Sequence, residues 1–199
     1  MSDIYNSHDI ETSLQETFGE TLSHGIVVSN LAYYVAKELG LMEEQCHNLA
    51  IAGLLHDIGK LKLRSYVYEE KESKYHIDEF RYVRLHPSLG YALLKEHGYN
   101  DEILNAVLYH HENYDGSGYP KNLKGEQIPI GARILHVCDA FGALIANRNY
   151  RSAFDAGTAI RIMIEENKEF DMRVFLTFQK VVNSEILDEI LNKVGIEEH

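Results

Sequence analysis

Apolar residues recur with a helical period over most of this 199-residue sequence, and this feature restricts the possible folds more than any other. The clearest stripe returns every three or four positions and comprises Ile130, Ile134, Val137, Cys138, Phe141, Leu144 and Ile145. An earlier stripe comprises Leu22, Ile26, Leu31, Val35 and Leu39. No segment alternates as a half-buried strand does, and only three prolines interrupt the chain. The sequence therefore predicts an all-α fold.

Glycines, prolines and polar runs divide this pattern into separate helices. Helices are expected at about 20–40, 43–58, 78–85, 88–96, 101–111, 130–145, 155–168 and 172–191. Gly59 is well placed as the C-terminal cap of the second helix. Residues 61–75 lack a clear period and are interpreted as a surface loop able to cover a site. Residues 113–127 are rich in glycine and predict a loop with several turns, and Pro129 stands where the first turn of a helix tolerates proline.

Length and charge indicate one acidic globular domain. We expect residues 1–19 to form a polar lead-in and residues 20–199 a single domain. The 31 acidic residues outnumber the 19 basic residues and give a net charge of -12. This balance argues against binding to a nucleic acid polymer or to a membrane surface.

Export and membrane insertion are also disfavoured. The first 20 residues hold no apolar core of a signal peptide. The longest apolar run, Leu49–Leu55, is far shorter than the roughly 20 residues of a transmembrane helix. Cys46 and Cys138 are too few and too far apart for a disulfide framework or a CxxC zinc site, so the expected location is the reducing cytoplasm.

Histidines and carboxylates gather near the ends of the expected helices. Neighbouring residues on a helix point about 100° apart, so each adjacent pair of ligands can serve two neighbouring ions. A carboxylate can span two ions, and we therefore assign Asp57 as the bridge, with Asp139 completing the shell of the first ion. The candidate metal ligands are Glu20, His24, His56, Asp57, His86, His110, His111 and Asp139.

This set of ligands predicts a multinuclear metal centre. Imidazole and carboxylate ligands without thiolate favour iron, manganese, cobalt or nickel, with zinc possible. Two ions about 3.5 to 4 Å apart can activate a hydroxide and stabilise a phosphoryl oxygen, so the implied chemistry is phosphoester hydrolysis. Taken singly, a His-Asp pair is more often a hydrogen-bonded helix end, and Glu20 with His24 is a common surface pair. Asp139 on an apolar face is the strongest single anomaly, because a buried carboxylate needs a partner.

Three segments of the chain resemble the signature of the HD-GYP family of HD phosphohydrolases. They are His56–Lys60, His86–Gly90 and His110–Pro120. The pattern continues in order through Leu123, Gly125, Ile128–Pro129, Ala132–Ile134, Asp139, Arg148 and Tyr150–Arg151. The resemblance covers about residues 20–178. It implies an HD-type helical bundle with additional C-terminal helices of the HD-GYP kind, which holds two or three divalent ions, most often iron or manganese.

The resemblance also implies an activity and a set of roles. The activity is hydrolysis of cyclic di-GMP to linear pGpG, to GMP or to both, by attack of a metal-bridging hydroxide. All eight candidate ligands fall on metal positions of the family, with Glu20 on the extra carboxylate position of three-metal members. Lys60 matches the lysine that contacts a substrate phosphate, so Lys60 and Asp57 are the expected catalytic residues. Tyr119, Arg148 and Arg151 match positions that help to seat the nucleotide.

Two departures from the family pattern leave alternatives open. Gly142 stands where many members have an aspartate, which predicts the loss of one polar contact to the substrate or to a group behind the metal ligands. The stretch after Lys60 lacks the usual Lys-Pro-Gly pattern and offers Tyr66, Tyr68 and Tyr75 instead. The chain could therefore be a weakly catalytic module that binds metal and nucleotide and contacts a signalling partner. It could also hydrolyse another cyclic dinucleotide or nucleotide phosphoester.

Overall fold

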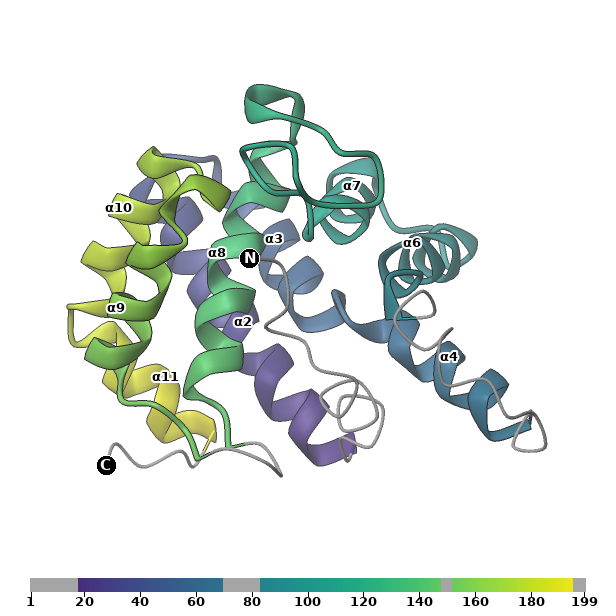
Figure 1. The fold of residues 1–199 in the computed structure, drawn as a ribbon, viewed down its shortest axis with the longest axis horizontal. Coiled ribbons are helices and arrows are strands. Elements are labelled where there is room, and N and C mark those ends of the chain that lie inside the picture. The colour runs from purple at the N-terminus through teal and green to yellow at the C-terminus, as the bar shows by residue number, and fades with distance from the viewer. Residues whose placement is uncertain (1–17, 70–82, 148–151, 195–199) are drawn as a thin grey trace.

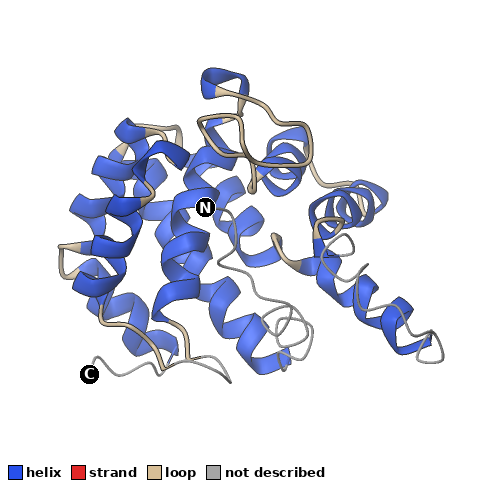
Figure 2. Ribbon diagram, viewed as in Figure 1, coloured by secondary structure: helices blue, strands red, loops and turns tan. Residues whose placement is uncertain are grey.

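The described part of the protein is entirely helices and loops. The computed structural model describes residues 18–69, 83–147 and 152–194. Figure 2 shows no strand within these ranges, which confirms the all-α prediction. None of the described helices is long and apolar enough to span a membrane.

Helix α2 (Phe18–Glu38) forms the centre of the bundle together with α3 (Glu43–Leu55) and α8 (Ile130–Ile145). The predicted stripe of α2 is only partly buried, because Leu31 and Val35 are fully enclosed whereas Leu22 is exposed. The buried face also includes Val28, which was not part of the stripe. Gly40 ends this helix with a φ of 79°, a conformation that glycine adopts without steric cost. Helices α4, α6 and α7 lie on one side of this centre, and α9, α10 and α11 lie on the other (Figure 1).

The predicted loop after residue 60 is wrong over its first half, because α4 runs from Ile58 to Glu69. The sequence of this helix shows no clear apolar period. Of its two leucines, Leu61 is exposed and Leu63 is buried. The chain turns at His56 and Asp57, and a new helix begins directly after that turn. Tyr66 and Tyr68 lie in α4, whereas residues 70–75 lie outside the described residues.

Gly59 lies inside α4 and does not cap α3, so that prediction is also wrong. Its missing side chain lets α4 pack closely on α6 (His86–Glu96). A Cβ atom on Gly59 would overlap the carbonyl oxygen of His86 and would lie 2.7 Å from the backbone nitrogen of Gly90. Because both neighbours are backbone atoms, they cannot move aside as a flexible side chain would.

We therefore expect Gly59→Ala to lower the free energy of unfolding by about 1–3 kcal/mol, as overpacking of a close contact does. Urea denaturation of the metal-free protein measures this loss. Gly157→Ala is the matched control, because Gly157 is exposed in the first turn of α9. The control should be unchanged or up to about 1 kcal/mol more stable. Equal stability of the Gly59 variant and the wild type would contradict the close packing of α4 on α6.

Two helices in the middle of the chain begin or end next to candidate ligands. Helix α6 begins at His86, two residues earlier than expected, and Pro87 sits in its first turn, where its missing N–H is not needed. Helix α7 (Asp101–Tyr109) stops just before His110, and Asn100 caps its start by accepting a hydrogen bond from the Ile103 amide. The expected helix at 78–85 lies mostly outside the described residues.

The predicted loop at 113–127 is confirmed, with one short 3-10 helix at Gly125–Gln127. The chain turns at Gly116 and Gly125, which have positive φ angles, as the glycine content of this segment suggested. Pro129 immediately precedes α8, which follows the predicted apolar stripe from residue 130 to 145.

The last predicted helix, 172–191, is wrong as a single element. In its place the chain forms α10 (Met172–Val182) and α11 (Ile186–Val194). The helix predicted at 155–168 is confirmed as α9 (Ala156–Glu165), which a 3-10 turn at Asn167–Glu169 follows. Residues 183–185 break the helix, and the Ser184 hydroxyl donates to the carbonyl of Val181 there. Both α10 and α11 pack on α2, with Leu187 and Ile190 buried. The apolar period continues across the break, which is why the sequence suggested one helix.

Candidate metal centre

The fold brings seven of the eight predicted ligands together from five places in the chain. His24 comes from the middle of α2, and Asp139 comes from α8. The turn between α3 and α4 supplies His56 and Asp57, the start of α6 supplies His86, and the end of α7 supplies His110 and His111. Their ligand atoms form three overlapping groups, each within 4.8 Å: His86 with His110 and His111; His24 with His56 and Asp57; His56 with His110 and Asp139.

Three of these histidines are held by carbonyl groups three residues earlier in the chain. The Nδ1 atoms of His56, His86 and His110 donate to the carbonyls of Gly53, Val83 and Val107, each at 2.7 Å. The last carbonyls of a helix lack intrahelical partners, so a histidine at a helix end can use one. A ring that donates from Nδ1 presents Nε2 as its second nitrogen.

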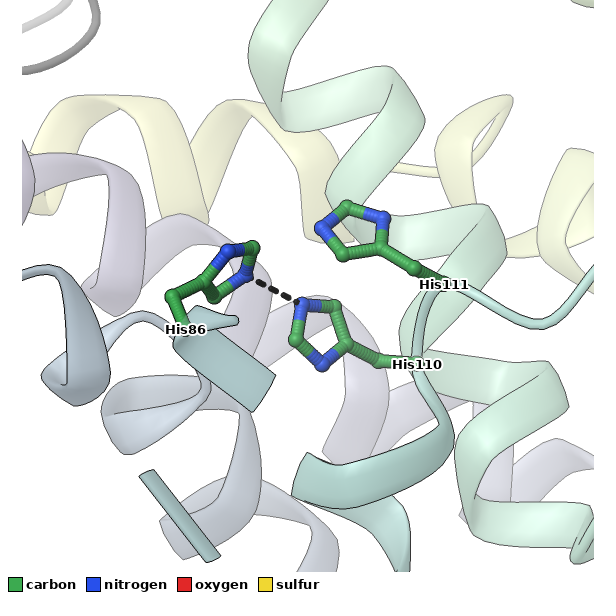
Figure 3. A group of neighbouring side chains, drawn as sticks. All are labelled: His86, His110 and His111. Atoms are coloured by element: carbon green, nitrogen blue, oxygen red, sulfur yellow. Dashed lines mark hydrogen bonds between the residues drawn. The ribbon is translucent and has the colours of Figure 1, made fainter. Parts of the chain in front are cut away.

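The two nitrogens Nε2 of His86 and His110 face each other at 3.2 Å (Figure 3). Burial lowers the pKa of His86 to about 4. The negative charge of Asp57 opposes this shift, and the positive charge of Lys60 adds to it. Burial and the neighbouring His56 lower the pKa of His110 to about 3. Burial and His110 also hold the pKa of His111 well below its usual value. Near pH 7 the rings are therefore neutral, and two lone pairs converge on one point in the protein interior. Such a point suits a cation.

The carboxylates face several of these histidines at once. Asp57 Oδ1 lies 3.3 Å from His86 Nε2, while Oδ2 lies 3.3 Å from His56 Nε2. Asp139 Oδ1 lies 3.0 Å from His24 Nε2 and 3.4 Å from His56 Nε2. Because the two oxygens of Asp57 reach different histidines, this arrangement suits a carboxylate that spans two ions.

The charges in the centre are strongly coupled. Burial would raise the pKa of Asp57, but Lys60 and His56 outweigh burial and hold it well below its usual value. The hydrogen bond from His24 and the nearby ring of His56 lower the pKa of Asp139 against the effect of burial. Burial also disfavours a charged His56, yet the carboxylates of Asp57 and Asp139 raise its pKa to about 10. The two carboxylates thus favour a proton on His56, and the same negative charge would favour a metal cation at this position.

The donor set fits divalent iron, manganese or a similar ion. It consists of imidazole nitrogens and carboxylate oxygens without thiolate. The two free cysteines, Cys46 and Cys138, are buried and belong to none of the three groups. Among the described residues, His56 Nε2 is buried without a hydrogen-bond partner, although carboxylate oxygens surround it.

The remaining predicted residues lie at different distances from this centre. Glu20 is exposed in the first turn of α2, one turn before His24, and belongs to none of the three groups. Lys60 on α4 pairs with Asp57, with 2.7 Å between Nζ and Oδ2. The ring of Tyr119 stacks on His111, with 4.8 Å between centroids and 24° between planes. Arg148 and Arg151 lie outside the described residues.

Glu112 is a site residue that the sequence analysis missed. It is buried, and its two carboxylate oxygens accept the backbone N–H groups of Lys121 at 2.6 Å and Leu123 at 2.8 Å. The Tyr119 amide also donates to the His111 carbonyl at 3.0 Å. These bonds hold the glycine-rich loop so that Tyr119 lies against His111. A glutamate directly after the paired histidines and directly before this loop was the available signal.

A family model and two curated relatives match most of this chain. The HD domain family matches residues 3–174. A cyclic di-GMP phosphodiesterase of Pseudomonas aeruginosa is 37% identical over 163 residues, which cover 81% of this chain and 39% of that protein. A cyclic di-GMP phosphodiesterase response regulator of Xanthomonas campestris is 38% identical over 151 residues, which cover 73% of this chain and 39% of that protein.

A solved structure shares the fold. The cyclic GMP-AMP-specific phosphodiesterase of Vibrio cholerae superposes with a TM-score of 0.67 and 20% sequence identity, over 94% of this chain and 51% of that chain. The chain spans about two fifths of the length of the two curated relatives described above.

Proposed function

We propose, from the premise that this chain belongs to the HD domain family, that it is a metal-dependent cyclic dinucleotide phosphodiesterase of the HD-GYP kind. The substrate we propose is cyclic di-GMP, hydrolysed to linear pGpG, to GMP or to both. The observation that carries the proposal is the convergence of five histidines and two aspartates in one buried cluster. The names of the curated relatives support the choice of substrate.

The proposed ligands are the seven clustered residues, with Glu20 as a ligand of a third ion. The proposed ions are iron or manganese, two or three per chain. Bound at this cluster, divalent ions would supply Lewis-acid activation of water and of a phosphoryl oxygen. Asp57 would hold two ions at a fixed separation, since its oxygens face His56 on one side and His86 on the other.

Lys60 and Tyr119 would act on the nucleotide. Lys60 Nζ lies 2.7 Å from Asp57 Oδ2, so its positive charge stands at the edge of the ligand cluster and can offset charge that develops on the phosphate. Tyr119 is held against His111 by the loop that Glu112 fastens, which places an aromatic ring beside the centre. We propose that Tyr119, Arg148 and Arg151 seat the nucleotide.

A second candidate substrate is a mixed cyclic dinucleotide, because the Vibrio cholerae relative of the same fold is specific for cyclic GMP-AMP. We also propose that the protein acts in the cytoplasm, and the free state of both cysteines is consistent with this location. We further propose that it acts with a signalling partner, because one curated relative is a response regulator.

Anaerobic turnover tests the proposal. The protein is purified without oxygen and supplied separately with Fe²⁺ or Mn²⁺, and cyclic di-GMP and cyclic GMP-AMP are offered in competition, with products separated by chromatography. We expect metal-dependent cleavage with cyclic di-GMP preferred, and the ratio of pGpG to GMP shows whether the second bond is cut. Nucleotide that binds without cleavage at full metal occupancy would overturn the catalytic proposal in favour of a binding module.

A further inference from the structure

His24 differs from three of the other metal-site histidines, His56, His86 and His110, in what holds its second nitrogen. The Nδ1 atoms of His56, His86 and His110 each donate to a carbonyl at 2.7 Å. The Nδ1 atom of His24 is buried and has no hydrogen-bond partner within the described residues. Its Nε2 atom lies 3.0 Å from Asp139 Oδ1.

His24 also differs in its place in the helix. It lies in the interior of α2, whereas the other three rings stand at helix ends or turns, where carbonyls without intrahelical partners are available. Within the described residues no carbonyl of α2 accepts a hydrogen bond from His24 Nδ1. The element that lies against this nitrogen is α8.

At the point of contact, α8 offers no side chain. A Cβ atom on Gly142 would lie 3.2 Å from His24 Nδ1, 3.1 Å from His24 Cε1 and 3.2 Å from Val28 Cγ2. Gly142 thus presents no side chain to Nδ1, and within the described residues no other group accepts a hydrogen bond from this nitrogen.

This arrangement affects how His24 can serve as a ligand. In the metal-free centre the proton of His24 belongs on Nε2, which donates to Asp139. When Nε2 gives its lone pair to an ion, the neutral ring must carry its proton on Nδ1, where it has no acceptor. The other three rings already carry the proton on Nδ1. Metal-bound histidines normally donate this second N–H to an acceptor, which orients the ring and raises its basicity.

We propose that Gly142 weakens the ion site formed by His24, His56 and Asp57, and makes it the lower-affinity site of the centre. The higher-affinity site is the one formed by His86, His110 and His111. This inference rests on the proposed metal centre and assigns position 142 as the determinant of metal affinity on the His24 side.

Matched variants at position 142 test the proposal. Gly142→Ser and Gly142→Ala add the same Cβ atom in the same space, but only serine brings an acceptor for His24 Nδ1. Its own hydroxyl hydrogen can go to the carbonyl of the preceding turn. Mn²⁺ binding is measured by calorimetric titration without nucleotide, and thermal melting of the metal-free variants checks that both are folded. We expect the weaker Mn²⁺ class to bind about 10-fold more tightly in the serine variant than in the alanine variant.

A second measurement avoids any crowding at position 142. In an otherwise unchanged protein, His24→Ala should remove the weaker Mn²⁺ class and keep the tighter one, whereas His110→Ala should remove the tighter class. Equal Mn²⁺ affinities in the serine and alanine variants, or a weaker class that survives in His24→Ala, would overturn the inference.

The titration separates this inference from the proposed function, because it uses Mn²⁺ alone. A protein that binds Mn²⁺ as expected but cleaves no nucleotide leaves the inference supported. Normal turnover with no effect of serine over alanine overturns the inference and leaves the function standing. A chain that binds no Mn²⁺ overturns both.

Discussion

Replacing Asp57 with asparagine is expected to lower the turnover of cyclic di-GMP by about a thousand-fold or more, which corresponds to about 4 kcal/mol of transition-state stabilisation. The two oxygens of Asp57 lie 3.3 Å from His56 Nε2 and 3.3 Å from His86 Nε2. Asparagine keeps one oxygen and replaces the other with an NH₂ group, which donates and cannot bind a cation. It also removes the negative charge beside Lys60. Steady-state kinetics in saturating Mn²⁺ measures the loss.

The same variant should hold fewer ions per chain, because no other side chain of the cluster faces both histidines with separate oxygens. Metal content after equilibrium dialysis against Mn²⁺ gives this count without reference to activity. Asp155→Asn is the matched control, since Asp155 caps α9 by accepting from the Thr158 amide and asparagine caps equally well. The control should retain full turnover. Wild-type metal content with unchanged kcat in Asp57→Asn would rule out the bridging role of Asp57.

Acid should destabilise the metal-free protein at a pH well above the range in which carboxylates titrate. Burial lowers the pKa of His86 to about 4 and of His110 to about 3, with His111 also well below its usual value. The unfolded chain takes up these protons near pH 6.5, whereas the folded chain does not. The contribution of these histidines to stability is therefore full above pH 6.5 and falls as the pH drops toward 4. His86 and His110 each contribute a loss of about 1.4 kcal/mol per pH unit, which is about 3 kcal/mol per pH unit for the two, and His111 acts in the same direction.

His56 acts with the opposite sign. Its pKa is raised to about 10 by Asp57 and Asp139, so its contribution to stability is fully present below pH 6.5 and is lost as the pH rises toward 10. The metal-free protein should thus be most stable near pH 6.5. A metal ion displaces the proton of His56, so the stabilisation given by Mn²⁺ should grow between pH 6.5 and 8.5.

Urea denaturation of EDTA-treated protein from pH 8.5 to 4.5 measures both effects. His110→Gln, which cannot titrate, should reduce the acid slope by about 1.4 kcal/mol per pH unit. His47→Gln changes an exposed histidine on α3 and should leave the slope unchanged. A free energy of unfolding that stays constant between pH 6.5 and 5 would mean that the buried rings accept protons in the folded protein.

The sequence by itself determined the helical class, most helix positions and which histidines and aspartates form the cluster. The stripe of α8 could be read directly, because one face of that helix is buried against neighbours along its length. In α2 the apolar period located the helix, although Leu22 of the stripe is exposed. The ligands could be identified because histidines and aspartates stood in pairs at helix ends and one aspartate interrupted an apolar face.

Tertiary contacts decided the elements whose period is weak or misleading. Helix α4 was interpreted as a loop because its sequence shows no clear period, and its packing on α6 through Gly59 became visible only in three dimensions. The separation of α10 from α11 was hidden because the apolar period runs across residues 183–185, although each segment turns its apolar face to α2 separately.

The same division holds for the metal centre. Spacing along the chain indicates which residue types can bind an ion, because that depends on the chemistry of each side chain. The supporting contacts depend on distances between atoms far apart in sequence, such as Glu112 to the amides of the following loop and Gly142 to the ring of His24. The family resemblance predicted that a polar contact is missing at Gly142, and that stays a prediction. The structure adds that a side chain at this position would meet the ring of His24, because only the packing of α8 on α2 determines what it would touch.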